Sequence, residues 1–257
     1  MKGISLYSIV PVRAESRESA EQNTQMLFGE LCEIMDQAER WTYVRLESDG
    51  QEGWVDAKMI TPMSDEEYAT YNEALPKAAM IAFPMAYAMS ENNSQTIPLT
   101  AGTRLPRYTN GQFEILGVRF RIDPGMVITQ PWEMSEQTLM KAVRFFLNVP
   151  YLWGGKNALG MDCSGFTQVI MSLFGKHLLR NASQQVTQGK PVSLADAKAG
   201  DLAFFGEGKI THVGIIIDPA RIIHCSGRVK VERIDETGIY NIEKGGYSHH
   251  LVSVNRL

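Results

Sequence analysis

Cysteine is scarce in this chain of 257 residues, and no pair of cysteines has the Cys-x-x-Cys spacing. The three cysteines are an odd number, which argues against a disulfide framework, and the missing spacing argues against a zinc site. We therefore expect no metal and no other cofactor, and this use of cysteine favours a reducing compartment.

Long apolar runs and runs of basic residues are also missing. No stretch approaches the about 18 apolar residues of a transmembrane helix, and residues 1–11 lack the order of a signal peptide. The formal net charge of −4 gives no reason to expect nucleic acid or a membrane surface as partner. We expect a cytoplasmic monomer, or a periplasmic or cell-envelope protein if a leader has been removed.

The sequence does contain a cysteine placed for chemistry. Residues 150–160 are rich in glycine, which is typical of a loop, whereas the residues after Cys163 predict a helix that ends at Gly175. Its apolar residues recur at helical spacing: Phe166, Val169, Ile170, Leu173 and Phe174. Asp162 or Ser164 can cap the first turn, so Cys163 lies at the positive end of the helix dipole, which favours a thiolate. A lone cysteine at the start of a helix is more often structural than catalytic. The choice between these two roles therefore depends on whether the chain also supplies a base for the thiol.

Histidine supplies the candidate partners. The five histidines are His177, His212, His224, His249 and His250. His212 and His224 lie in β-rich runs on either side of residues 218–220, which predict a hairpin turn. An odd loop would place both on one face of the sheet, and an even loop would place them on opposite faces. A base at His212, oriented by His224, would complete a catalytic set with Cys163. Each histidine alone is more simply a structural strand residue, and the pair near the C-terminus is interpreted as structural.

Four motifs occur in a characteristic order within residues 131–257. They are Tyr151-Leu152-Trp153-Gly154-Gly155, Asp162-Cys163-Ser164-Gly165-Phe166, Thr211-His212-Val213-Gly214-Ile215 and Ile223-His224. This part of the chain resembles the NlpC family of papain-like cell-wall cysteine peptidases. The resemblance implies that Cys163 is the nucleophile, His212 the general base and then acid, and His224 the orienting residue. It also implies a place for Tyr151 beside the oxyanion, although Tyr151 can equally be a packed aromatic.

The preceding residues predict β structure. Short strands are expected in the first segment at residues 4–12, 27–35, 41–46 and 53–55. Residues 1–62 resemble a bacterial SH3-like barrel, and residues 78–130 a second one. Between them, residues 63–77 predict a linking helix in which Ser64 and Glu67 have capping-box spacing. The expected fold is therefore α+β: a papain-like peptidase domain, residues 131–257, preceded by two all-β SH3-like barrels.

The resemblance also implies a substrate. Family members with this layout cut murein peptides between γ-linked D-glutamate and meso-diaminopimelate or L-lysine, release L-Ala-D-Glu, and require a free N-terminal L-alanine. A buried ammonium needs a carboxylate partner. Asp162 matches one such family residue, and Glu52 and Tyr87 are further candidates. Ser164 is either a substrate contact or only a capping hydroxyl, and Trp153 either a wall of the cleft or a core residue.

Three other functions remain open at the level of sequence. The chain could act as a peptidase on intact, exported murein, and N-blocked stem peptides would separate that activity from recycling of free peptides. It could be a murein-peptide binding protein without activity, although the set of Cys163, His212 and His224 argues against this. Acyl or amide transfer to an acceptor other than water is the third.

Overall fold

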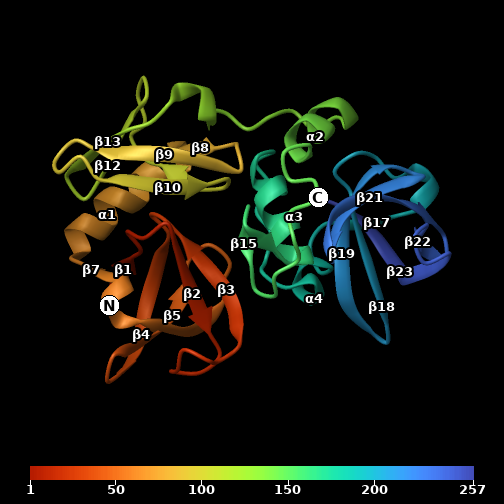
Figure 1. The fold of residues 1–257 in the computed structure, drawn as a ribbon, viewed down its shortest axis with the longest axis horizontal. Coiled ribbons are helices and arrows are strands. Elements are labelled where there is room, and N and C mark those ends of the chain that lie inside the picture. Colours follow the sequence, from red (N-terminus) through yellow and green to blue (C-terminus); the bar gives the residue numbers. More distant parts are fainter. The chain divides into compact units, whose positions relative to one another are not determined.

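A computed structural model describes residues 1–257, which divide into two compact units, Met1–Gln130 and Pro131–Leu257. Figure 1 labels most of their helices and strands. The helices are short, and none of them is long and apolar enough to cross a membrane.

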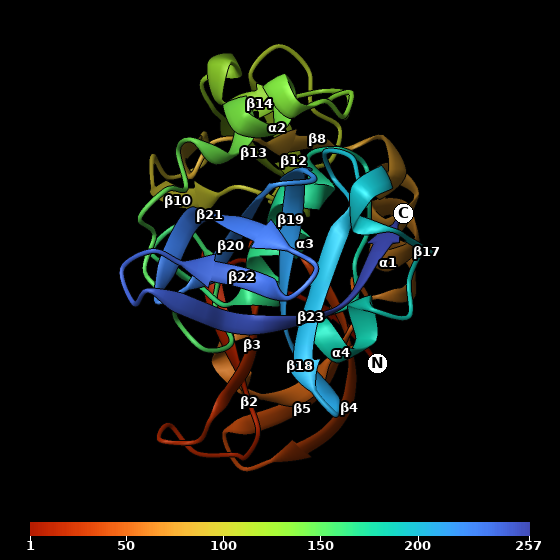
Figure 2. The same cartoon turned by 90° about the vertical axis from the view of Figure 1, so that its right-hand side faces the viewer.

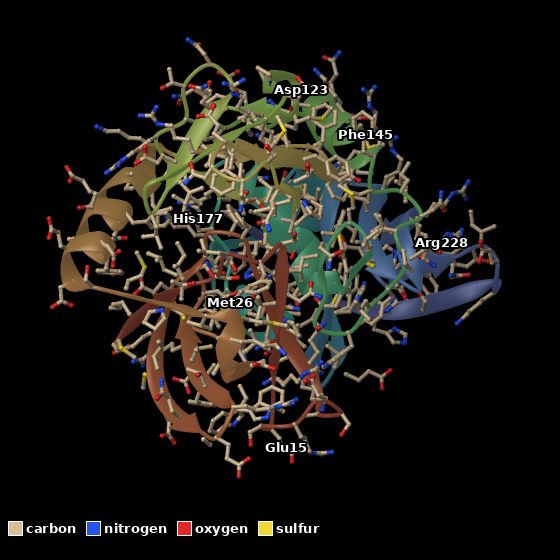
Figure 3. All side chains as sticks on the ribbon, turned by 60° about the vertical axis from the view of Figure 1, so that its left-hand side comes forward. Glu15, Met26, Asp123, Phe145, His177 and Arg228 are labelled. Atoms are coloured by element: carbon tan, nitrogen blue, oxygen red, sulfur yellow. The ribbon has the colours of Figure 1, made fainter.

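The N-terminal unit begins with one antiparallel sheet of seven strands in the order β3-β2-β6-β5-β4-β1-β7. The strands are β1 (Lys2–Ile4), β2 (Ile9–Arg13), β3 (Gln22–Leu27), β4 (Leu31–Ala38), β5 (Trp41–Leu46), β6 (Glu52–Asp56) and β7 (Thr61–Met63). The expected strand at 41–46 is confirmed, because Val44 and Leu46 alternate with the exposed Arg45. Met26, which Figure 3 labels, is fully buried in the core of this sheet.

One expectation for this sheet was wrong, and one strand was not predicted. The run expected at 4–12 is split into β1 and β2, because the backbone of Ser5 bonds with the turn at Gly29 and Glu30 instead of continuing a strand. The strand β3 was missed, since its first residues are polar and show no apolar alternation.

The helix α1 (Asp65–Ala74) follows, at the place where the sequence predicted a linking helix. The Ser64 hydroxyl accepts a hydrogen bond from the Glu67 N–H at 3.2 Å, and the Glu67 carboxylate accepts one from the Ser64 N–H at 2.8 Å. The predicted capping box is therefore confirmed, and it satisfies two backbone donors that have no partner within the helix.

The rest of this unit forms two small antiparallel sheets, β10-β9-β13-β12 and β11-β8-β14. Their strands are β8 (Ala79–Ile81), β9 (Met85–Ser90), β10 (Thr96–Thr100), β11 (Arg104–Leu105), β12 (Gln112–Ile115), β13 (Val118–Arg121) and β14 (Val127–Ile128). Phe28 of the first segment packs edge-on against Phe113 and Phe120. One hydrophobic core thus joins part of the first segment with α1 and the two small sheets, while a second core lies within the seven-stranded sheet. The second barrel stays a prediction.

The C-terminal unit places helices before a curled sheet, in agreement with the α+β prediction. Its helices are α2 (Glu136–Val143), α3 (Cys163–Ser172) and α4 (Ala182–Gln185). Its strands are β15 (Lys156–Asn157), β16 (Gly160–Met161), β17 (Lys190–Val192), β18 (Leu202–Glu207), β19 (Lys209–Asp218), β20 (Arg221–Ser226), β21 (Arg228–Asp235), β22 (Gly238–Asn241) and β23 (Gly246–Arg256).

The last strand closes this sheet into a barrel, because β23 pairs with both β18 and β22. Figure 2 shows the strands from β18 to β23 in front and α3 behind them. The helix α3 contacts β19 and β20, and its residues Phe166, Val169 and Ile170 are buried as the sequence predicted. Sheet and helix together bring the start of α3 to the strands that carry the paired histidines.

Candidate active site

Cys163 is the first residue of α3 and is only 7% exposed. Burial raises the pKa of its thiol to about 11, and the neighbouring Asp162 carboxylate raises it further. The backbone N–H groups of Val213 and Ser164 and the charge of Arg180 lower the pKa, but by less. The prediction of a thiolate was therefore wrong for the resting protein: the effect of the helix end is present, but burial outweighs it.

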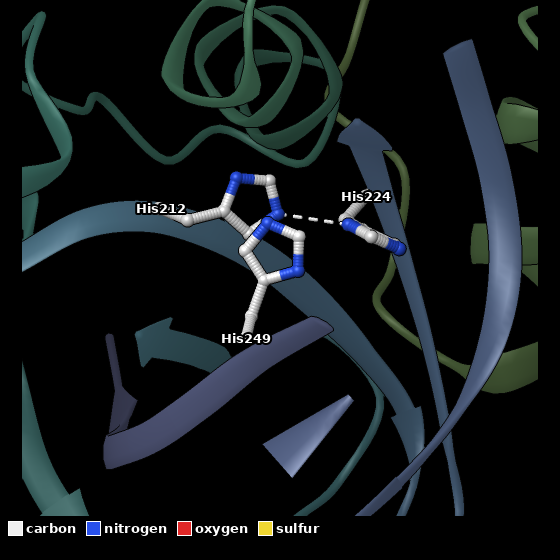
Figure 4. A group of neighbouring side chains, drawn as sticks. All are labelled: His212, His224 and His249. Carbon is white, nitrogen blue, oxygen red and sulfur yellow. Dashed lines mark hydrogen bonds between the residues drawn. The ribbon is translucent and has the colours of Figure 1, made fainter. Parts of the chain in front are cut away.

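His212 and His224 meet on one face of the barrel sheet. His212 Nε2 lies 2.8 Å from His224 Nδ1, and a dashed line marks this contact in Figure 4. Gly214 pairs directly with His224, so His212, two residues earlier on β19, shares the face of His224. Only Pro219 and Ala220 separate the two strands, and such an even loop alone would place the two histidines on opposite faces. However, β19 carries a bulge between Ile216 and Asp218, and its extra residue brings both histidines to the same face.

Gly214 makes this arrangement possible. A Cβ atom at position 214 would lie 2.8 Å from the Cβ of His224 and 2.8 Å from the Cδ1 of Ile222. Real Cβ atoms do not approach so closely, so a side chain there would displace one of these neighbours. The lack of a side chain at Gly214 therefore allows His224 to lie beside His212.

Both histidines are held in their neutral form. Burial lowers the pKa of His212 well below its ordinary value, and His224 and His249 lower it further. Burial also lowers the pKa of His224, against a hydrogen bond to Glu232 that raises it. Because His212 Nε2 is engaged with His224, Nδ1 is the ring nitrogen of His212 that remains for proton exchange with a thiol.

Glu232 lies behind His224 and was missed by the sequence analysis. Its Oε2 is 2.8 Å from His224 Nε2 and 3.1 Å from the Lys230 Nζ. His224 and Lys230 are directly paired across β20 and β21, and Glu232 is two residues further along the same face. The alternation of β21 could have indicated a polar face, but not which strand it would meet.

His249 also belongs to this cluster, although the sequence analysis interpreted it as structural. Figure 4 shows its ring lying over that of His212. The two rings are stacked, with centroids 4.1 Å apart and planes 26° apart. Burial lowers the pKa of His249 to about 4, and His224 adds to this effect. In the sheet β18 separates β23 from β19, and His249 lies in the part of β23 that closes the barrel by pairing with β22, so no local pattern could have identified this contact. His250 lies outside the cluster, more than half exposed, 3.6 Å from Glu207.

One ring nitrogen from each of His212, His224 and His249 lies within 4.8 Å of the other two, which is close enough to consider a metal. However, His212 Nε2 and His224 Nδ1 are engaged with each other, and two of the three rings are stacked rather than converging. This arrangement suits proton transfer between hydrogen-bonded rings better than coordination of a metal ion.

Asp162 caps α3 and forms a buried ion pair. Its Oδ1 accepts a hydrogen bond from the Gly165 N–H at 2.6 Å, and its Oδ2 accepts one from the Gly154 N–H at 2.9 Å. Both Arg180 Nη atoms reach the carboxylate, at 3.0 and 2.5 Å, and the Ser164 hydroxyl lies 3.2 Å away. Arg180, which the sequence analysis missed, is fully buried. The predicted substrate contacts of Asp162 and Ser164 stay predictions, and both residues also hold the start of α3.

Tyr151 and Trp153 lie in the loop that leads to Cys163. The Tyr151 N–H donates to the Gly227 carbonyl, and the residue bridges to Met161. Burial raises the pKa of the Tyr151 hydroxyl, followed by the influence of Cys163 and Asp162, so the hydroxyl remains a hydrogen-bond donor. Trp153 is 60% exposed, which disagrees with the interpretation as a core residue. Its role as a cleft wall stays a prediction.

Glu52 and Tyr87 lie in the N-terminal unit. The Glu52 carboxylate accepts a hydrogen bond from the Tyr43 hydroxyl at 3.1 Å, and it lies 3.8 Å from Arg45. Tyr87 is 61% exposed on β9, where its hydroxyl points to the sulfur of Met85. Their predicted contacts with the substrate ammonium stay predictions.

Parts of this chain match known protein families and individual relatives. The sequence profile of the NlpC/P60 family matches residues 148–256, and that of a bacterial dipeptidyl-peptidase SH3 domain matches residues 12–60. A γ-D-glutamyl-L-lysine dipeptidyl-peptidase of Bacillus subtilis is 32% identical over 78% of this chain and 71% of its own length. The protein of the same name from Bacillus cereus is 27% identical over 78% of this chain and 66% of its own length.

The fold has a counterpart among solved structures. An NlpC/P60 family protein from Bacillus cereus covers 100% of this chain and 99% of its own, with a TM-score of 0.83 at 20% identity. This likeness concerns the fold, which is a papain-like domain together with an SH3 domain. The B. subtilis relative and the matched family profile establish that the chain belongs to the NlpC/P60 family of cysteine peptidases.

Proposed function

We propose that this peptidase hydrolyses the bond between γ-linked D-glutamate and a diamino acid in murein peptides with a free N-terminal L-alanine. The products are L-Ala-D-Glu and the remainder of the peptide, in the recycling of cell-wall fragments. The observation that carries the proposal is the likeness to the B. subtilis γ-D-glutamyl-L-lysine dipeptidyl-peptidase over 78% of the chain. The paired His212 and His224 beside α3 support the chemistry.

The acylation step starts from neutral partners. Because the pKa of the Cys163 thiol is raised and that of His212 is lowered, His212 Nδ1 takes the thiol proton as the sulfur attacks. The Sγ–C bond forms at the γ-carbonyl of D-glutamate, and the negative charge on its oxygen is met by the Tyr151 hydroxyl and the Cys163 N–H. His212 then protonates the leaving amine of the diamino acid as the C–N bond breaks.

Deacylation reverses the roles. A water molecule gives one proton to His212 Nδ1 and adds to the thioester carbonyl, and the Cys163 sulfur leaves with the electron pair of the S–C bond. The thiolate then regains its proton from His212, and L-Ala-D-Glu departs with a free γ-carboxyl group, which releases its own proton to the solvent. His224 keeps the ring of His212 in place throughout, through the 2.8 Å contact with Nε2.

The requirement for a free amine belongs to the same proposal. An ammonium enclosed in a cleft needs a carboxylate and further acceptors, because an unpaired buried charge is costly. Asp162, Glu52 and Tyr87 are the proposed acceptors, with Ser164 and Trp153 beside the peptide. We also propose that residues 78–130 form a second SH3-like barrel. In this proposal the first barrel, which contains the matched residues 12–60, excludes peptides whose N-terminus is blocked.

Digestion of synthetic L-Ala-γ-D-Glu-meso-diaminopimelate and its L-lysine counterpart, each free and N-acetylated, tests this function by mass spectrometry. We expect L-Ala-D-Glu from the free peptides alone, and loss of activity in Cys163→Ala with an unchanged circular dichroism spectrum. Equal cleavage of the acetylated peptides would reject the amine requirement and favour an enzyme of intact murein. Cleavage of none of them would reject the proposed substrate.

A further inference from the structure

We propose that Glu232 is a positioning residue for this reaction: its carboxylate fixes which nitrogens of His224 and His212 carry protons, and Lys230 opposes its charge. The catalytic use of the two histidines rests on the proposed function. Their proton positions do not, because they follow from hydrogen bonds within the protein.

The geometry forms a continuous chain of contacts across three neighbouring strands. His212 Nε2 lies 2.8 Å from His224 Nδ1, and His224 Nε2 lies 2.8 Å from Glu232 Oε2. Lys230 is paired directly with His224 across β20 and β21, and its Nζ is 3.1 Å from Glu232 Oε2. The side chain of His224 is 0% exposed and that of Glu232 10%, so water contributes little to this chain.

The proton positions follow from the chemistry of the end group. An ionised carboxylate only accepts hydrogen bonds, so His224 Nε2 must carry its proton toward Glu232. A neutral imidazole has one proton, which leaves His224 Nδ1 as an acceptor, and His212 must therefore donate from Nε2. The remaining nitrogen of His212, Nδ1, is then unprotonated and ready to accept the Cys163 proton.

The surroundings of Glu232 favour its ionised form. Burial alone would raise the pKa of its carboxyl, but hydrogen bonds to His224 and Lys230 lower it overall. The reaction creates an imidazolium at His212, and the negative charge at the end of the chain stabilises it through His224. Lys230 acts in the opposite direction, since its positive charge lowers the pKa of both His212 and His224.

Other charged and titratable groups around this chain must be held constant in a test. They are Cys163 of α3 with Asp162 and Arg180 beside it, His249 of β23, and Lys244 in the turn before β23. None of these groups is changed in Glu232→Gln or Lys230→Met. The surface variants Glu243→Gln and Lys141→Met remove the same charges at exposed positions elsewhere in this unit and serve as matched controls.

The first measurement is independent of any substrate. Nitrogen-15 NMR of the histidine rings in the full chain should show His212 and His224 both protonated on Nε2 and unprotonated on Nδ1 at pH 7. In Glu232→Leu, whose side chain cannot accept a hydrogen bond, His224 should show a mixture of both forms. A wild-type His212 that carries its proton on Nδ1 would overturn the proposal, as would an unchanged His224 in Glu232→Leu.

The second measurement is the pH dependence of kcat/KM on the free tripeptide. We expect the acidic limb to move down by about 0.5 to 1 pH unit in Glu232→Gln and up by a similar amount in Lys230→Met, with no shift in the two controls. Glu232→Gln should also lower kcat on the order of tenfold, a fraction of what general acid–base catalysis contributes, with KM little changed.

Shifts in the same direction for both variants, or no shift in either, would overturn the role of the charges. If Glu232 and Lys230 had only a structural role, the two variants would lose activity, but the acidic limbs of their pH profiles would not move in opposite directions. If the tripeptide is not cleaved by the wild-type protein, the proposed substrate fails while the NMR result still decides the proton positions. The two proposals can therefore fail separately.

Discussion

At the scale of single residues, the resting state of Cys163 differs from that of a thiolate–imidazolium pair. The thiol is buried next to the Asp162 carboxylate, and His212 is buried among other histidines. Both environments favour the uncharged form. In the proposed mechanism, the nucleophile is therefore generated only when His212 removes the proton during attack.

Alkylation of Cys163 by iodoacetamide measures this state directly. With the thiol pKa raised to about 11, the alkylation rate should rise steadily from pH 6 to pH 9, without a plateau at low pH. The rate is followed by mass spectrometry of the peptide that contains Cys163, with the buried Cys32 as internal reference. A fast rate that is constant between pH 5 and pH 7 would show a thiolate and contradict this reading.

Much of the site could be predicted at this scale, because its main residues lie in short motifs. Cys163 follows a glycine-rich loop and begins an amphipathic helix, and His212 and His224 lie in adjacent β-rich runs. Glu232 and His249 could not be predicted in the same way. Their roles arise from sheet pairing and barrel closure, which join segments that no local pattern relates.

At the scale of elements, the start of α3 depends on the Asp162–Arg180 pair. The Arg180 side chain is 1% exposed, and both of its Nη atoms donate hydrogen bonds to the Asp162 carboxylate. The same carboxylate accepts hydrogen bonds from two backbone N–H groups at the helix start. It therefore anchors both the loop before Cys163 and the first turn after it.

Asp162→Asn should consequently destabilise the protein by about 3 to 5 kcal/mol, because it removes a charged partner of a buried guanidinium. Ser64→Ala, which removes the exposed cap of α1, should cost only about 1 kcal/mol. Urea unfolding followed by circular dichroism compares the two variants. Equal small losses would mean that the Arg180 pair contributes no more than an ordinary helix cap.

The elements themselves were predictable to different degrees. The capping box of α1 and the amphipathic face of α3 are local features, and both are confirmed. The strand β3 was missed because burial of its polar residues is decided by neighbouring strands. The shared core around Phe28 likewise joins segments that sequence analysis treats as separate.

At the scale of the whole molecule, the buried histidines make stability depend on pH. The native pKa values of His212, His224 and His249 are all lowered, that of His249 to about 4, from an unfolded value near 6.5. Between these limits the unfolded chain binds more protons than the native protein. Stability is therefore fully present above about pH 6.5 and is lost as pH falls toward 4.

Each such histidine contributes a slope of up to about 1.4 kcal/mol per pH unit within this window. His249→Phe keeps an aromatic ring against His212 but removes one titrating group, so it should flatten the slope between pH 6.5 and pH 4. His250→Phe, at a position that is more than half exposed, is the matched control and should leave the slope unchanged. Identical slopes in wild type and His249→Phe, from urea unfolding at each pH, would contradict the buried-histidine account.

The central claim is that Cys163 carries the γ-D-glutamyl acyl group during cleavage of the murein peptide. Acid quenching of the protein with L-Ala-γ-D-Glu-meso-diaminopimelate, followed by peptide mapping, measures this directly. We predict an L-Ala-D-Glu acyl group attached as a thioester to the peptide that contains Cys163, and no adduct in Cys163→Ala. Turnover of the peptide by Cys163→Ala, or an acyl group on another residue, would contradict the account.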